Sequence, residues 1–251
     1  MSEYPTTFLG WVTMLAEKYG KEFLRGTGVT LELAVLGTIF GCLLGFAVGL
    51  VQSITVDPNA SALSRCVTKV CKIIVACYVE VFRGTPMMVQ AMVIYYGSMS
   101  VFDLDIPSMG AGILVLSLNT GAYMAESVRG AIGGIDPGQM EGGRAIGMSY
   151  LQTMLHVIIP QALRNLIPQI GNTFISAIKD TSVLNVISVT ELYFIARTVS
   201  GTYYKFFETY MIICVIYLVL TFVTSRLLRL LEKWMAGSRN YELVLEEEEA
   251  A

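Results

Sequence analysis

The chain of 251 residues has few of the groups from which soluble enzymes build active sites. Only 15% of its residues are charged, whereas a soluble domain carries roughly 25%. The single histidine, His156, argues against a histidine-based metal site or catalytic triad. A phosphate-binding loop and a Gly-x-Ser-x-Gly motif are also absent. We therefore expect no catalytic residues, no metal and no cofactor bound by this chain.

The cysteines give no sign of a disulfide framework. None of the five forms a CxxC pair, and most lie in or beside apolar segments, where cysteine behaves as a small hydrophobe. A cleavable signal peptide is not evident, because the first apolar block starts late and lacks a short basic lead.

The sequence is rich in long apolar runs. Apolar residues make up 54% of it, and the mean hydropathy is +0.61. Because a membrane helix needs about 20 such residues, we predict an all-α integral membrane protein with five spans. The second span is interrupted at Arg83–Pro86. The spans cover roughly Leu31–Ile54, Lys72–Tyr96, Met109–Ile132, Leu155–Ile178 and Phe206–Leu231.

Lysine and arginine in the short connections set the predicted orientation. They gather between spans one and two, between spans three and four, and after span five, whereas Asp103 and Asp105 lie between spans two and three. We predict an extracytoplasmic segment over 1–30, a membrane domain over 31–231 and a cytoplasmic acidic tail over 232–251. The N-terminus would lie outside and the C-terminus inside.

Four glycines at steps of four, Gly37, Gly41, Gly45 and Gly49, form one smooth ridge on the first span. Such a ridge lets another helix approach closely. We favour packing within the protomer over a contact between two copies.

The loop after the third span predicts a short helix over about 136–148. Asp136 and Pro137 are typical of a helix start, and Gln139 would complete a capping box. Gly147 would end the helix. Ser149 and Gln152 predict a second capping box. By composition, the helix either docks into a partner through Gly142 and Gly143 or lies on the lipid.

The residues of this loop resemble a known motif. Permeases of binding-protein-dependent ABC importers carry Glu-Ala-Ala, three residues, Gly, nine residues, Ile, one residue, Leu-Pro. Here the same spacing holds Glu141-Gly142-Gly143, then Gly147, then Val157, then Ile159-Pro160. The two glycines in place of alanines weaken the helix by about 1 kcal/mol each.

Further segments resemble the polar amino-acid (histidine/glutamine/arginine-type) permeases of this family. They are Glu80–Pro86 with Gln90, Gly121–Glu126 with Arg129-Gly130, Pro160–Ala162, and Lys179–Val183. The resemblance covers most of the chain.

The resemblance implies the five-helix core of a type I ABC importer permease in a prokaryotic cell membrane, with the loop helix as coupling helix. It implies partners: ABC ATPase subunits that bind ATP and Mg²⁺, a second permease subunit, identical or homologous, and an extracytoplasmic amino-acid-binding protein. Nucleic acid is not expected. The residues expected to couple to the ATPase are Gln139, Glu141, Gly142, Gly143, Arg144 and Gly147.

The fourth span carries a polar stripe at helical spacing: Gln161, Asn165, Gln169, Asn172, Ser176 and Lys179. Because unpaired polar groups facing lipid are costly, the stripe should face protein or water. It either lines the path of a substrate or makes hydrogen bonds between helices.

Charged and polar groups near the stripe suggest how an amino acid would be held. Asp180 or Glu191 could accept its ammonium, and Lys179, Thr181 and Ser182 could bind its carboxylate. Asn119, Tyr123 and Glu126 share one face of the third span, and Glu126 would suit a cationic substrate. As structural ion pairs we favour Glu80 with Arg83 and Glu126 with Arg129.

Two other functions remain open. An ion-coupled secondary transporter usually shows internal repeats and more spans, and no convincing repeat is present. The other alternative is an ABC permease for another small solute. Only the motifs that resemble amino-acid permeases argue against it. A membrane enzyme is disfavoured by the missing motifs.

Overall fold

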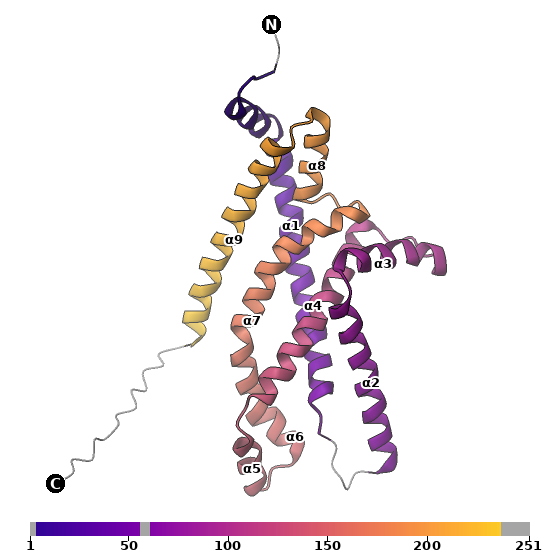
Figure 1. Cartoon of the computed structure of the whole chain (residues 1–251). Helices are drawn as coiled ribbons and strands as arrows, with labels where there is room; N and C mark the ends of the chain where they lie inside the picture. Colours follow the sequence, from indigo (N-terminus) through magenta and orange to yellow (C-terminus); the bar gives the residue numbers. More distant parts are fainter. Residues whose placement is uncertain (1–3, 56–60, 237–251) are drawn as a thin grey trace, which may run out of the picture.

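The computed structural model describes residues 4–55 and 61–236, and within these ranges all regular structure is helical (Figure 1). The predicted all-α fold is confirmed. The elements in chain order are α1 (Phe8–Ser53), α2 (Ala62–Gly84), α3 (Met87–Phe102), α4 (Ser108–Gly133), α5 (Pro137–Ala145), α6 (Tyr150–Thr153), the π-helix η1 (Met154–Ile158), α7 (Ile159–Asp180), the 3₁₀-helix η2 (Thr181–Ile187), α8 (Leu192–Tyr203) and α9 (Phe206–Ala236).

The centre of the bundle is the contact between α1 and α4, which the glycine ridge makes possible. A Cβ atom added to any of the four glycines would lie 2.5–2.6 Å from a side-chain atom of α4, far inside normal contact. The prediction of packing within the protomer is thus confirmed. The pairs are Gly37 with Leu116, Gly41 with Thr120, Gly45 with Met124, and Gly49 with Val128.

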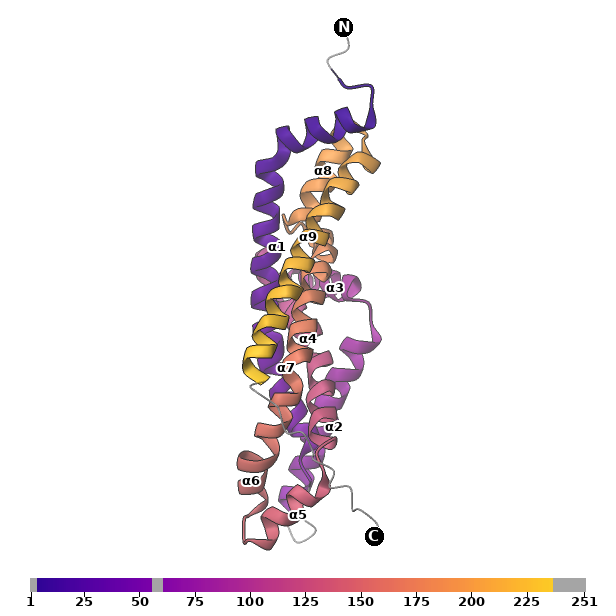
Figure 2. The ribbon, with the colours of Figure 1, turned by 90° about the vertical axis from the view of Figure 1, so that its left-hand side faces the viewer.

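The first helix is longer than predicted. Instead of beginning near Leu31, α1 begins at Phe8, where the Thr7 side chain accepts a hydrogen bond from Gly10 N. Figure 2 shows its N-terminal part running across the end of the bundle before the helix turns along it. Trp11 and Phe23 of this part pack against α8 and α9. The hydropathy pattern did not indicate this N-terminal part of α1, because charged residues interrupt its apolar residues.

The second predicted span is two helices. α2 ends at Gly84, Thr85 is extended (φ −120°, ψ 148°), and α3 leaves in another direction (Figure 1). The cause is Pro86, which has no N–H to donate and forces the residue before it out of the helical region.

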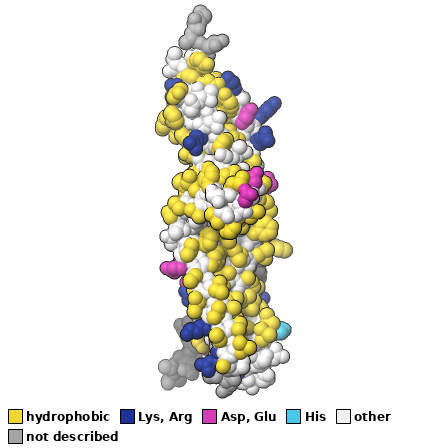
Figure 3. Space-filling model, turned by 90° about the vertical axis from the view of Figure 1, so that its right-hand side faces the viewer, with side chains coloured by type: hydrophobic (Ala, Val, Ile, Leu, Met, Phe, Trp, Pro, Cys, Tyr) yellow, Lys and Arg dark blue, Asp and Glu magenta, His cyan; other side chains and the backbone are white. Residues whose placement is uncertain are grey.

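By length and composition, two helices of the described ranges can cross a membrane alone, α1 and the 29 residues Phe206–Trp234. The bent pair Tyr150–Ile187 and Leu192–Tyr203 would add a third. The predicted spans in α2 and α4 are not among these helices, and the predicted span in α7 counts only as part of the bent pair. All three carry charged or polar groups. On the face shown in Figure 3, apolar side chains nevertheless cover much of the helical bundle, and lysines and arginines lie toward its two ends. The tail beyond 236 lies outside the described residues.

Candidate functional site: a polar cavity and a helical knob

A polar cavity of about 460 Å³ lies where the α2–α3 break, α4, α7 and the start of η2 meet. Its size falls in the range of small-molecule sites. Five of the predicted path residues line it, namely Asn119, Tyr123, Asn172, Ser176 and Asp180. The other lining residues are Thr85, Pro86, Met87, Thr120, Gln169, Thr173 and Val183.

The wall at the helix break is fixed by a buried glutamine. Gln90, 6% exposed, donates from Nε2 to Phe82 O, Thr85 O and Thr85 Oγ1, each at 2.9 Å. Phe82 O lost its helical partner where α2 ends, because Pro86 has no N–H, and Thr85 O lies in the extended link to α3. Gln90 therefore stabilises the break.

The same network orients Asn119 of α4. Its Nδ2 donates to Gln90 Oε1 at 3.1 Å and to Phe82 O at 3.4 Å. Because the amide nitrogen is occupied, the Asn119 oxygen is left to accept a donor from the cavity. A polar side chain predicted for the path thus also serves the structure of the wall.

Asp180 is the sole carboxylate of the cavity, and it makes no ion pair with the described residues. Around it lie the amides of Gln169 and Asn172 and the hydroxyls of Thr173 and Ser176. A carboxylate suits an ammonium group, and amide or hydroxyl donors suit a carboxylate. The cavity therefore has both kinds of group that an amino-acid zwitterion requires.

Lys179 and Ser182 lie elsewhere. They line a separate pocket of about 320 Å³ together with tyrosines of α8 and α9. Adjacent residues of a helix point about 100° apart, which separates Lys179 from Asp180. The two residues therefore do not line the polar cavity, and their binding of a substrate carboxylate stays a prediction.

Thr181 and Glu191 are buried and serve the local structure. Thr181 is 0% exposed and donates to Ile178 O at 2.8 Å. Glu191, also 0% exposed, is the N-cap of α8. Its carboxylate accepts from Tyr193 N (2.9 Å), Phe194 N (2.7 Å) and Tyr217 Oη (3.1 Å). Neither side chain lines the polar cavity, and their predicted substrate contacts stay predictions.

A charge cluster lies next to Tyr123. Glu126 accepts from Arg129, as predicted, and forms a second ion pair with Arg83 at 3.6 Å. The predicted pair of Arg83 with Glu80 is wrong, because Arg83 turns to α4 and Glu80 is exposed. The Arg83 guanidinium also lies 5.6 Å from the centre of the Tyr123 ring. Since Glu126 is engaged twice, it does not act as a free anion of the cavity.

The predicted loop helix is α5, which forms a knob at the far end of the bundle (Figure 1). Asp136 caps it by accepting from Gly138 N at 2.7 Å, and Pro137 begins it. Gly147, at φ +86°, ends it with bonds from Gly147 N to Arg144 O and from Met148 N to Gly143 O, the Schellman arrangement. The second capping box, Ser149 with Gln152, is confirmed.

Two details of α5 differ from the prediction. Gln139 does not close a capping box; its Oε1 accepts from Gln161 Nε2 at 3.3 Å. Gly143 faces inward, and a Cβ there would lie 2.5 Å from Thr153 Cγ2. Gly143 therefore fits α5 against Thr153 behind it, whereas Gly142 has open space at its Cβ position. The coupling role predicted for both glycines stays a prediction.

The sequence argument missed several residues of these sites. Ile146, 79% exposed, is the most exposed apolar side chain of the knob. Its signal was an apolar residue at the C-cap of a polar helix. Glu141 and Arg144 border a wider cavity of about 1240 Å³ between α5 and the ends of α1 and α4. Thr85 and Thr173 line the polar cavity but do not belong to the polar stripe, so the sequence pattern did not indicate them.

Comparison with known proteins gives consistent results. Residues 67–237 match the family described as "Binding-protein-dependent transport system inner membrane component". The chain is 34% identical to a probable amino-acid permease protein, YxeN, of Bacillus subtilis, over 85% of this chain and 91% of that protein. It is 36% identical to the glutamine transport system permease protein GlnP of Escherichia coli, over 84% and 92%.

Solved structures show the same likeness. A crystal structure described as an amino acid ABC transporter with histidines is 37% identical, with a TM-score of 0.77, over 91% of this chain and 98% of that one. The MetNI methionine ABC transporter, at 20% identity and a TM-score of 0.67, shares the fold.

Proposed function

This chain belongs to the family of binding-protein-dependent transport system inner membrane components, and from that premise we propose how it carries a polar amino acid. It is the permease subunit of an amino-acid ABC importer, as are the relatives that match it over most of their length. The observation that supports the choice of substrate is the cavity with Asp180 among amide and hydroxyl groups.

In the proposed path, Asp180 binds the ammonium group of the amino acid. Asn172 and Ser176 donate to its carboxylate, and Tyr123 borders its side chain. Because Tyr123 is 50% exposed in the single chain and polar groups facing lipid are costly, a second permease subunit covers the open side of the cavity.

Energy comes from partner subunits. We assign α5 to a groove of an ABC ATPase, where Ile146 and Gly142 make the closest contacts. ATP and Mg²⁺ bind to that ATPase and not to this chain. Hot spots of interfaces are typically buried apolar or aromatic anchors, and the exposure of Ile146 fits that role.

The orientation follows from the same assignment. If α5 meets the ATPase, the α5 end is cytoplasmic, the C-terminus is cytoplasmic and the N-terminus lies outside. An extracytoplasmic binding protein then delivers the amino acid at the end where α8 and the N-terminal part of α1 lie (Figure 2).

The test is uptake of labelled amino acids, including glutamine and histidine, into vesicles that hold the complete transporter. Asp180→Asn should reduce uptake by tenfold or more while the subunits still copurify. Asp105→Asn, the same chemical change at an exposed position outside the cavity, serves as the control. Uptake by Asp180→Asn at the rate of the parent protein would contradict the role of Asp180.

A permease for another small solute is the alternative, and the uptake panel separates the two. An ion-coupled secondary transporter would need no ATPase. Uptake that depends on an ion gradient and persists without ATP would support that alternative.

A further inference from the structure

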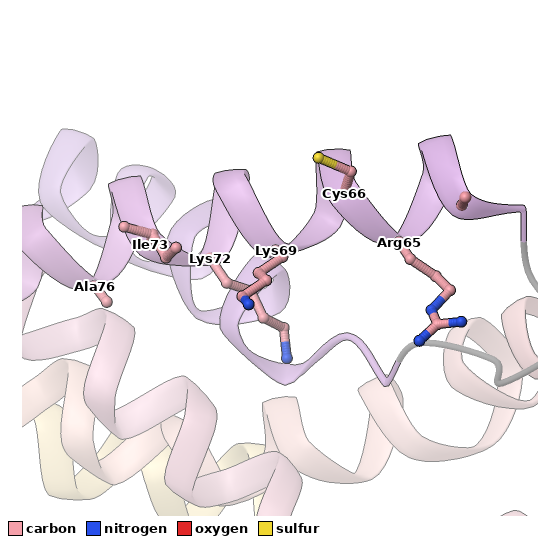
Figure 4. A pocket seen from close by; sticks show the side chains of 7 residues that line it. Arg65, Cys66, Lys69, Lys72, Ile73 and Ala76 are labelled. Carbon is pink, nitrogen blue, oxygen red and sulfur yellow. The ribbon is translucent and has the colours of Figure 1, made fainter.

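A groove of about 700 Å³ runs beside the first half of α2, at the end of the molecule that carries α5. It is lined by Ala62, Arg65, Cys66, Lys69, Lys72, Ile73 and Ala76. Figure 4 shows the three cationic side chains extending from the same side of α2.

The groove is strongly cationic. Arg65, Lys69 and Lys72 stand at steps of four and three, which places them on one helix face. None of them forms an ion pair with the described residues. They lie near the N-terminus of α2, whose first turn holds no acidic residue and whose dipole is itself positive. An anion is thus the group that this region lacks.

The surroundings of the cations are apolar. The single buried residue of α2 is Val79, so its first half stands apart from the core. Ile73 and Ala76 continue the groove beyond the cations. Around the helix, the exposed apolar side chains are Leu63, Val67, Val70 and Ile74. An occupant needs an anionic head and an apolar tail.

We propose that this groove binds an acidic phospholipid of the phosphatidylglycerol type. Its phosphate lies among Arg65, Lys69 and Lys72, and an acyl chain follows Ile73 and Ala76. Clusters of lysine and arginine at the cytoplasmic end of a membrane helix attract acidic headgroups in this manner. A second copy, related by an axis along the membrane normal, would bring the same cations to the same depth, where like charges repel.

The test uses native mass spectrometry of the full chain in detergent, titrated with phosphatidylglycerol or phosphatidylcholine of identical acyl chains. The parent protein should bind phosphatidylglycerol roughly tenfold more tightly, in line with the attraction of several cations to an acidic lipid. The variant R65Q/K69Q/K72Q should lose this preference. K69Q alone, at an exposed position, should lose part of it and serves if the triple variant does not fold.

The matched control is K18Q/K21Q/R25Q, which removes three positive charges at the other end of the molecule. It should keep the lipid preference. A triple variant at α2 that keeps the preference would overturn the proposal, and so would equal losses in both variants, since these report net charge alone. Displacement of the lipid by an equal concentration of glycerol phosphate would also overturn it, because the site would then serve a soluble anion.

Discussion

Replacing Gly45 by alanine should separate α1 from α4. The new Cβ would lie 2.5 Å from Met124 Cβ, 2.7 Å from Gly121 O and 2.9 Å from Ala125 N. Carbon atoms pack best at about 3.5–4.0 Å, so the helices must move apart by about 1 Å. Two of the three obstructing atoms belong to the backbone and cannot turn aside. Overpacking of this kind costs about 1–3 kcal/mol.

Gly28→Ala in the same helix is the matched control, because its Cβ would meet nothing within 4 Å. Both changes gain the same helix propensity, about 1 kcal/mol, so the difference between them isolates the clash. At about 2–4 °C per kcal/mol for a chain of this size, Gly45→Ala should melt about 2–12 °C below Gly28→Ala. Far-UV circular dichroism of the purified chain in detergent measures this. Equal melting temperatures would refute the tight contact.

Two other changes test the cavity wall and the knob. Gln90→Leu leaves the Thr85 carbonyl without its donor and Phe82 O with only the longer bond from Asn119, so thermal unfolding should show a loss of about 1–3 kcal/mol; unchanged stability would contradict the role of the glutamine. Ile146→Asp should weaken retention of the ATPase in copurification by tenfold or more, as expected for an interface anchor, while Ile146→Leu retains it. Full retention by Ile146→Asp would exclude this residue from the docking surface.

Features set by neighbouring residues were predictable from the sequence. The spacing of the four glycines predicted that another helix of the protomer packs closely on α1, and Ser149 with Gln152 predicted a helix start. These features depend on helical periodicity and local hydrogen bonds, both of which follow from the spacing of residues along the chain. The same periodicity placed Asn172 and Ser176 together on the cavity wall.

Features that depend on distant contacts were not predictable. Glu191 looked like a free anion, but the fold buries it at the start of α8 beside Tyr217. Arg83 found Glu126 on α4 instead of Glu80 on its own helix. In each case a partner far away in the sequence decided the outcome.

The central claim is that an amino acid occupies the cavity beside Asp180. Thiol labelling of Ser176→Cys tests it most directly, in a complete transporter from which the five native cysteines have been removed. The transported amino acid should slow labelling at 176 and leave Leu163→Cys, outside the cavity on the same helix, unchanged. Labelling of Ser176→Cys at the same rate with and without the amino acid would contradict the assignment of the cavity.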